Sequence, residues 1–283
     1  MIQDLLCLDA LRAQYDALFC DVWGVVHNGR ARFFAACEAL QRFRQAGGVC
    51  LLVSNVPKPA SAILAQLDRL GVPEACWDGI ITSGDATRAV LAARAPGLMH
   101  RIGPSQDCAL WEGLGLFEAE LDEAAFLTVS GPNHWQETPE DYRGLLMRAQ
   151  KLGLEMICAN PDIQVREGDR LIYCAGALAR LYESLGGLVT MAGKPHPPIY
   201  ALAREKLAQI AGCEIAPSRV LAIGDGIETD LLGAQNEGLD ALFIAGGMHG
   251  EAFTRPDGLD LPAIETALTK AGARARFVMA QLC

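Results

Sequence analysis

Residues 17–25 read Ala17-Leu18-Phe19-Cys20-Asp21-Val22-Trp23-Gly24-Val25, an apolar run that ends in a single carboxylate and a glycine turn. A run of this composition is typical of a strand buried on both faces, as in a parallel sheet. A carboxylate at the carboxyl end of such a strand lies in the crevice where open α/β sheets bind their ligands. Asp21 is therefore the leading candidate for a reactive group.

The overall composition limits the class of protein. The chain has 283 residues, of which 51% are hydrophobic, enough for one large core or two modest ones. Its net charge of -10 disfavours nucleic acid or an anionic membrane surface as a partner. The ten cysteines include no Cys-x-x-Cys pair, which indicates buried free thiols in a reducing compartment. Without a leader pattern or an apolar run of membrane-spanning length, we expect a cytoplasmic protein.

Strand-like and helix-like segments alternate along the chain, which predicts an α/β fold built on a parallel sheet. After the first strand, strands are expected at residues 49–53, 79–82, 98–103, 125–130, 154–159, 189–191, 219–223 and 241–244. The middle segments repeat the rhythm in their own right. We therefore expect a Rossmann-like, doubly wound parallel-sheet core of residues 1–83 and 189–283, with an α/β domain of residues 84–188 inserted into it.

Polar residues follow three further predicted strands. Ser54 and Asn55 follow the second strand, Lys194 follows the strand at 189–191, and Asp225 follows the strand at 219–223, with Asp230 five residues later. If these strands are parallel neighbours of the first, all four loops lie along one edge of a single sheet. Each residue alone is an ordinary turn or cap residue, but in this order they form a set.

The set favours a particular chemistry. Carboxylates without histidines suit Mg²⁺, which proteins usually hold with one or two carboxylates and the substrate phosphate. A hydroxyl and a lysine suit the phosphate oxygens. A carboxylate such as Asp21 can then act as a nucleophile and form an aspartyl-phosphate, which water hydrolyses. The residues therefore predict Mg²⁺-dependent hydrolysis of a small phosphorylated metabolite.

Six blocks of the sequence resemble the haloacid dehalogenase superfamily, in its class of capped phosphatases related to NagD and to 4-nitrophenylphosphatase. They are Asp21-Val22-Trp23-Gly24-Val25, Val53-Ser54-Asn55, Thr82-Ser83-Gly84-Asp85-Ala86-Thr87, Ala159-Asn160-Pro161-Asp162, Gly193-Lys194-Pro195-His196-Pro197-Pro198-Ile199-Tyr200 and Ile223-Gly224-Asp225-Gly226-Ile227-Glu228-Thr229-Asp230. The resemblance implies a phosphomonoester substrate, such as a sugar phosphate, and Mg²⁺ as the cofactor. It also implies that the insertion is a cap that sets specificity, and that the cap pairs with a second copy in a homodimer.

The resemblance further implies a role for each matched position. Asp21 would be the nucleophile and a Mg²⁺ ligand, with the backbone carbonyl of Trp23 and the Asp225 carboxylate as further ligands. Asp230 would orient Lys194 or the metal-bound waters. The residues implied to bind the transferring phosphate are Ser54, Asn55 and Lys194.

Trp23 departs from the family's pattern, in which a second aspartate at this position protonates the leaving oxygen and later activates water. Tryptophan does neither, and losing a positioned general acid costs on the order of 10²–10⁴ in rate. Three explanations stay open: substrates with good leaving groups such as acyl phosphates, a replacement by His27, His196 or His134, or a site that binds phosphate compounds and turns them over poorly. Trp23 could equally form a wall of the substrate pocket.

Two other classes of function are weighed against the phosphatase. A non-catalytic protein that binds or senses a phosphorylated ligand would also use this fold, although Asp21, Lys194 and Asp225 are all present. An attack of Asp21 on carbon, as in dehalogenases, has no use for a metal site at Asp225. Turnover of phosphate esters distinguishes the phosphatase from the binding protein. Loss of activity with a chelator argues against an attack on carbon.

Overall fold

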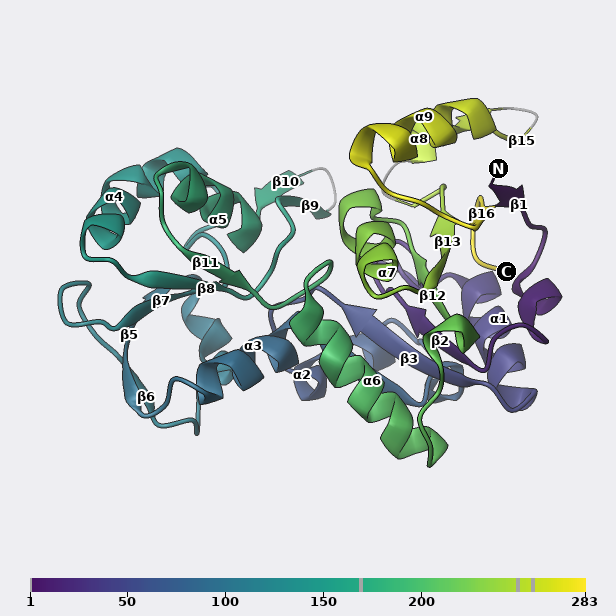
Figure 1. Cartoon of the computed structure of the whole chain (residues 1–283), viewed down its shortest axis with the longest axis horizontal. Coiled ribbons are helices and arrows are strands. Elements are labelled where there is room, and N and C mark those ends of the chain that lie inside the picture. The colour runs from purple at the N-terminus through teal and green to yellow at the C-terminus, as the bar shows by residue number, and fades with distance from the viewer. Residues whose placement is uncertain (1, 168–169, 248–249, 256–257) are drawn as a thin grey trace. The chain divides into compact units, whose positions relative to one another are not determined.

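The computed structural model describes residues 2–167, 170–247, 250–255 and 258–283. Its contacts divide the chain into two compact units. The first unit comprises Met1–Ser54, Ile63–Ile81 and Tyr200–Cys283, and the second comprises Asn55–Ala62 and Thr82–Ile199. Each unit is built on its own sheet flanked by helices, so the predicted α/β fold is confirmed (Figure 1).

A seven-stranded sheet forms the centre of the first unit, in the order β1-β16-β13-β12-β2-β3-β4. Its strands are β1 (Gln3–Asp4), β2 (Ala17–Cys20), β3 (Val49–Ser54), β4 (Gly79–Thr82), β12 (Val220–Gly224), β13 (Asp240–Ile244) and β16 (Phe277–Met279). The strand β2 pairs in parallel with both β3 and β12, and Cys20 stands opposite Leu52 and Ile223. The carboxyl ends of these three strands therefore lie side by side.

The helices of the first unit cover this sheet. They are α1 (Phe34–Gln45), α2 (Ala60–Arg69), α6 (Pro197–Ala211), α7 (Leu232–Asn236), α8 (Gly250–Phe253) and α9 (Leu261–Ala271), and two short strands, β14 (Thr254–Arg255) and β15 (Gly258–Leu259), pair beside them. The first residues of α2 and α6 belong to the second unit. Ala234 of α7 and Ile264 of α9 pack with Phe243 and Val278 of the sheet in one apolar cluster. Burial of such side chains supplies most of the stability of the unit.

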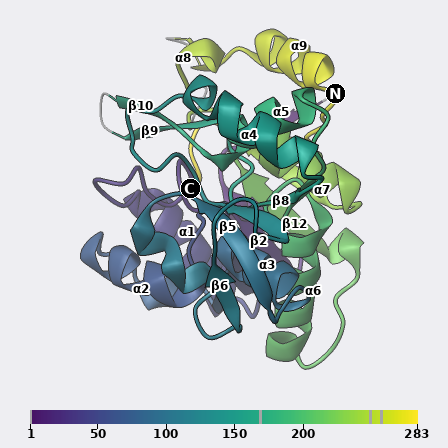
Figure 2. The same ribbon diagram turned by 90° about the vertical axis from the view of Figure 1, so that its left-hand side faces the viewer.

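The second unit has a five-stranded sheet in the order β11-β8-β7-β5-β6, with all neighbouring pairs parallel. Its strands are β5 (Gly97–Ile102), β6 (Leu116–Glu118), β7 (Phe126–Val129), β8 (Glu155–Cys158) and β11 (Val189–Met191), and β9 (Gln164–Glu167) and β10 (Arg170–Tyr173) form a separate antiparallel hairpin. The helix α3 (Ser83–Ala92) covers one face, and α4 (Arg143–Lys151) and α5 (Ala175–Ser184) cover the other (Figures 1 and 2). Phe126 packs toward α3 and its neighbour Leu127 toward α4 and α5, because side chains alternate along a strand.

Most of the strands expected from the sequence form, but one lies in a different sheet. The strand Val189–Met191 pairs with β8 in the second unit. The expectation that all four polar loops follow neighbouring strands of one sheet is therefore wrong for the loop that carries Lys194. The chain leaves β8, passes through the β9-β10 hairpin and α5, and returns as β11 in parallel beside β8, the usual placement after a short helical crossover.

The cysteines agree with the expectation of free thiols. Among the described residues none of the ten forms a disulfide, and six of them are buried, whereas Cys108 and Cys213 are exposed. Among the described residues, no helix combines the length and apolar character that a membrane span requires.

Candidate active site

Three carboxylates meet at the carboxyl edge of the first unit's sheet. Asp21 directly follows β2, and its amide donates to the Ile223 carbonyl at 2.8 Å, which continues the pairing of β2 with β12. Asp225 directly follows β12, and Asp230 lies in the helical segment Ile227–Leu231. One oxygen of each carboxylate lies within 4.8 Å of the other two. These residues are only 7%, 4% and 6% exposed, and carboxylate oxygens are the ligands that hard divalent cations prefer.

Three glycines, one of them at the end of β12, make room for the carboxylates. A Cβ atom on Gly24 would lie 2.0 Å from Asp225 Oδ2, and one on Gly247 would lie 2.2 Å from the same oxygen. A Cβ atom on Gly224 would lie 2.1 Å from Asp230 Cγ. Real Cβ atoms do not approach this closely, so any side chain at these positions would displace the acids. This role of the glycines was not predicted from the sequence, although the glycine directly before Asp225 could have indicated it.

The side chain of Trp23 folds back over the turn that follows Asp21. Its ring meets the His27 ring edge-on, with centroids 5.5 Å apart and planes at 77°. A Cβ atom on Gly29 would lie 2.3 Å from Trp23 Cη2, so the indole rests on bare backbone. The Gly24 amide donates to the His27 carbonyl at 2.8 Å and closes the turn. The indole nevertheless stays 40% exposed.

His27 is a buried, neutral imidazole. Its side chain is 2% exposed, and its Nδ1 accepts a hydrogen bond from the Gly29 amide at 3.1 Å. Burial lowers the pKa of His27 from 6.5 to about 4, because the imidazolium form is costly to desolvate. At neutral pH His27 is therefore a weak proton donor, which disfavours it as the replacement for a missing acid. Burial also lowers the pKa of His196, whereas the His134 side chain is exposed.

In the second unit, Asn55 holds the backbone of Lys194. Asn55 Oδ1 accepts from the Lys194 amide at 2.7 Å, and Asn55 Nδ2 donates to the Lys194 carbonyl at 3.1 Å. The same Nδ2 donates to Asp162 Oδ1 at 2.9 Å. Asn55 and Lys194 are both buried. The Asn55 side chain thus bonds both the amide and the carbonyl of Lys194, as a neighbouring β-strand would, and so positions Lys194.

Gly193 lies where the loops of Asn55 and Ser83 approach the loop that carries Lys194. A Cβ atom on Gly193 would lie 2.5 Å from Ser83 Oγ and 2.6 Å from Asn55 Oδ1. The Ser83 hydroxyl in turn donates to the Ala159 carbonyl at 2.6 Å. The segments that meet here are therefore those around Asn55, Ser83, Ala159 and Gly193. Ser83 and Asp162 are supporting residues that the sequence analysis did not assign to the site.

The predicted site residues thus form two groups. Asp21, Asp225 and Asp230 meet in the first unit, where Ser54 is buried at the end of β3, the strand next to β2. Asn55 and Lys194 meet in the second unit. Each group is defined within its own unit.

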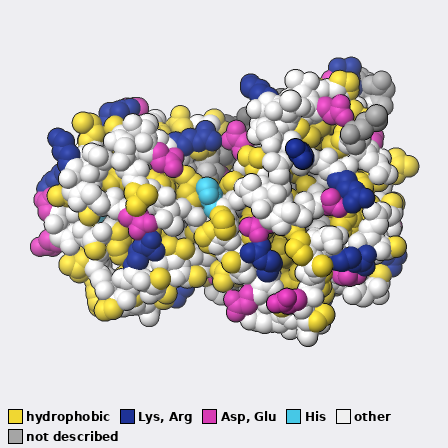
Figure 3. Space-filling view, in the orientation of Figure 1, with side chains coloured by type: hydrophobic (Ala, Val, Ile, Leu, Met, Phe, Trp, Pro, Cys, Tyr) yellow, Lys and Arg dark blue, Asp and Glu magenta, His cyan; other side chains and the backbone are white. Residues whose placement is uncertain are grey.

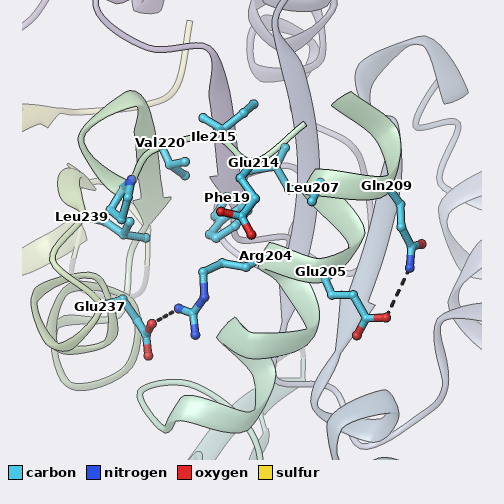
Figure 4. A pocket seen from close by; sticks show the side chains of 12 residues that line it. Phe19, Arg204, Glu205, Leu207, Gln209, Glu214, Ile215, Val220, Glu237 and Leu239 are labelled. Atoms are coloured by element: carbon cyan, nitrogen blue, oxygen red, sulfur yellow. Dashed lines mark hydrogen bonds and ion pairs between the residues drawn. The ribbon is translucent and has the colours of Figure 1, made fainter. Parts of the chain in front are cut away.

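A cavity of about 690 Å³ in the first unit lies away from the carboxylates (Figure 4). Phe19, Leu207 and Val220 line its apolar part, and Arg204 forms an ion pair with Glu237 at its rim. Val220 is the first residue of β12, whereas Asp225 follows the last. A five-residue strand separates its ends by roughly 13–17 Å, so this cavity lies toward the opposite edge of the sheet.

We expect Gly247→Ala to weaken binding of a divalent cation about tenfold or more, because its Cβ must displace the Asp225 carboxylate. Calorimetric titration of the folded protein with Mg²⁺ or Mn²⁺ measures the change. Gly250→Ala is the matched control, since a Cβ there meets no atom within 4 Å. Equal cation affinity in Gly247→Ala and the wild type would contradict the role given to this glycine.

Asn55→Ala should lower the free energy of unfolding by about 1–3 kcal/mol, because it removes three hydrogen bonds from buried groups. Urea unfolding followed by circular dichroism measures this change. Asn28→Ala is the control, because exposed Asn28 accepts only from the amides of its own turn at Arg30 and Ala31. If Asn55→Ala lowered the free energy of unfolding no more than the control, the hydrogen bonds from Asn55 to Lys194 and Asp162 would not have the stabilising role given to them.

The pKa of His27 predicts a pH dependence of stability. The unfolded chain, with a pKa near 6.5, takes up the proton before the folded protein, whose pKa is about 4. The neutral His27 therefore contributes its full share to the free energy of unfolding above pH 6.5. As the pH falls from 6.5 toward 4, the free energy of unfolding decreases by up to about 3 kcal/mol. His27→Asn should flatten this part of the profile of urea midpoint against pH, with pH 8 as the reference. An unchanged slope would show that another group is responsible.

Comparison with known proteins agrees with this geometry. Residues 18–117 match the haloacid dehalogenase-like hydrolase family, and residues 191–278 match a second family described as HAD-hydrolase-like. The crystal structure of a hydrolase of the haloacid dehalogenase-like family from Brucella suis 1330 is similar to this one, and the two sequences are 45% identical. The match covers 98% of this chain and 99% of that one, with a TM-score of 0.87.

More distant relatives carry names of phosphatases. The acid sugar phosphatase of Staphylococcus aureus is 25% identical over 242 residues, which are 83% of this chain and 88% of the relative. The 4-nitrophenylphosphatase of Thermotoga maritima shares the fold, with a TM-score of 0.71 at 19% identity over 96% of each chain. The resemblance inferred from the six blocks is confirmed. The extent and identity of the match to the Brucella structure show that this chain belongs to the haloacid dehalogenase-like hydrolases.

Proposed function

We propose that the protein is a Mg²⁺-dependent phosphatase that hydrolyses a small phosphorylated metabolite through an aspartyl-phosphate on Asp21. The observation that carries the proposal is the group of three buried carboxylates within 4.8 Å of one another, one of which directly follows β2. Relatives named acid sugar phosphatase and 4-nitrophenylphosphatase support the same reaction class. A sugar phosphate or a similar phosphomonoester is the substrate class we expect.

The carboxylates fit Mg²⁺ by the chemistry of their donors. Asp21, Asp225 and Asp230 offer hard oxygen ligands in a buried setting, without a histidine or cysteine among them. The backbone carbonyl of Trp23 is the further ligand that we propose. When bound, the ion would offset the negative charge of the phosphate as it approaches the acids.

The reaction follows from the roles proposed for the chain's own residues. A carboxylate oxygen of Asp21 attacks phosphorus, and the bond from phosphorus to the leaving oxygen breaks with its electron pair remaining on that oxygen. Lys194 and Ser54 bind phosphate oxygens, and Asn55 keeps Lys194 in place through its backbone. Water then attacks the phosphorus of the aspartyl-phosphate, which releases inorganic phosphate and restores Asp21.

The leaving oxygen has no carboxylic acid beside it at position 23. Trp23 carries no acidic proton donor, and His27 is neutral at pH 7. We therefore expect slow turnover of alkyl phosphates, by a factor on the order of 10²–10⁴ relative to a site with a general acid. Aryl and acyl phosphates escape much of this penalty, because their leaving groups are weak bases.

The two units take different parts in this proposal. The first unit carries the nucleophile Asp21, and the inserted segment, predicted from the sequence as residues 84–188, serves as a cap that selects the substrate. On the face drawn in Figure 3, Lys and Arg side chains lie scattered among acidic and apolar ones. A homodimer through the cap and a cytoplasmic location stay predictions.

One observation favours a second candidate function. Trp23 occupies the position next to Asp21 where an acid would speed turnover, so a protein that binds a phosphorylated ligand without hydrolysing it is the alternative.

Phosphate release separates the two functions. With Mg²⁺, the wild type should release inorganic phosphate from members of a panel of aryl, acyl, sugar and nucleotide monophosphates. Asp21→Asn should lower the rate about 10³-fold or more, because the nucleophile is lost. Asp68→Asn, an exposed aspartate of α2, is the control.

A chelator should abolish the activity, and Mg²⁺ in excess should restore it. No release from any member, with phosphate esters still bound, would refute the phosphatase and favour the binding protein.

A further inference from the structure

We propose that the cavity of about 690 Å³ in the first unit binds an organic cation, an amine attached to a ring or to a comparable apolar body. The proposal does not depend on the phosphatase function, because this cavity lies toward the edge of the sheet opposite to Asp21 and Asp225. Three properties of the cavity carry the proposal: its size, its apolar floor and the excess of acids among the residues that line it.

The first property is size. Cavities that bind small molecules have volumes of about 300–1,000 Å³, and this one lies within that range. Its walls are the helix α6, the segment 214–217 that follows α6, and the turn 237–239 that follows α7 (Figure 4). These walls and the strands beneath them belong to the first unit. The lining is therefore formed within one unit.

The second property is an apolar floor. Phe19 of β2, Val220 of β12 and Leu207 of α6 form it, and all three are buried. Ile215 and Leu239, which are half-buried, add to this apolar lining. A ring or a compact hydrocarbon is the group that such a lining binds, because the contact removes apolar surface from water.

The third property is charge. Of the described residues that line the cavity, Arg204 is the only cation, and its guanidinium forms an ion pair with the Glu237 carboxylate. Two further acids, Glu205 and Glu214, line the same cavity. Three carboxylates therefore accompany one cation. A second cation is attracted to this lining, whereas an anion is repelled by it.

The two further acids point in different directions. Glu205 turns toward Gln209, whose Nε2 donates to Glu205 Oε1 at 3.3 Å. Glu214 instead points toward Phe19, among the apolar side chains (Figure 4). Within the described part of the chain, no basic side chain is paired with Glu214. Glu214 is therefore the partner of the ligand's ammonium group, and the apolar lining holds the ring.

The exposure of Glu214 limits how strongly it selects a charged ligand. An ion pair at an exposed site changes an affinity only about twofold to fivefold, because water screens it. Most of the affinity therefore comes from the apolar body, and the charge decides which of several similar bodies is preferred. A ligand that has only one of the two features binds less tightly than one that has both.

Three probes with the same ring test the proposal. Tryptamine has an ammonium group, tryptophol a neutral hydroxyl and indole-3-propionate a carboxylate, on side chains of similar length. Calorimetric or NMR titrations use the full chain with Mg²⁺ in excess, so that the ion competes for the carboxylates of the candidate active site. Tryptamine should bind about twofold to fivefold more tightly than tryptophol, and indole-3-propionate should bind most weakly. Methylammonium, which has the charge without a ring, should bind at least tenfold more weakly than tryptamine.

Two variants locate the binding site. Ala208→Phe places a ring in the cavity from α6 and should weaken tryptamine binding tenfold or more. Glu214→Gln should remove the preference for tryptamine over tryptophol and leave the affinity for tryptophol unchanged. Glu265→Gln, at an exposed position of α9, is the matched control and should retain the preference. Circular dichroism shows whether Ala208→Phe folds, and Glu214→Gln carries the test if it does not.

Several results would overturn the proposal. Equal affinities of the wild type for the three indoles would show that the site does not select a cation. Tryptamine binding that neither Ala208→Phe nor Glu214→Gln changes would place the ligand elsewhere on the protein. An absence of binding would refute the site altogether. Because none of these measurements involves phosphate release, the cation site and the phosphatase can each fail without the other.

Discussion

The pairing of β2 with β12, which brings buried carboxylates together at one edge of the sheet, is the interaction on which the candidate site depends. Asp21, Asp225 and Asp230 come from two strands and a short helical segment, and their oxygens lie within 4.8 Å of one another. The pairing of β2 with β12 delivers the first two to the same edge, and Gly24 and Gly247 leave the space that Asp225 occupies. Buried carboxylates need partners that offset their charge, and a divalent cation is the partner that we propose for this group.

The turn that follows Asp21 shows how one residue changes the chemistry of a site without changing its architecture. The turn is closed by backbone, because the Gly24 amide donates to the His27 carbonyl at 2.8 Å. Tryptophan there exchanges a proton donor for a fixed aromatic surface, and it packs against His27, whose burial keeps the imidazole neutral.

Much of the fold and part of the candidate site could be predicted from the sequence. The apolar run that ends at Asp21 predicted a buried strand, and the alternation of segments predicted parallel α/β sheets. In a parallel sheet all carboxyl ends meet at one edge, so the sequence predicts that Asp21 and Asp225 lie close together. Asp230 was expected nearby in a supporting role, and the structure brings its carboxylate as close as the other two.

The rest depended on contacts between residues far apart in the chain. The sequence by itself determined the strands, their direction and the acids that end them, because burial pattern and chain direction are local properties. Only the tertiary structure decided that β11 joins β8, that the Asn55 side chain holds the Lys194 backbone, and that His27 is neutral. The partner of a strand, the partner of a side-chain amide and the desolvation of an imidazole are set by what packs against them in space. Local sequence does not carry that information.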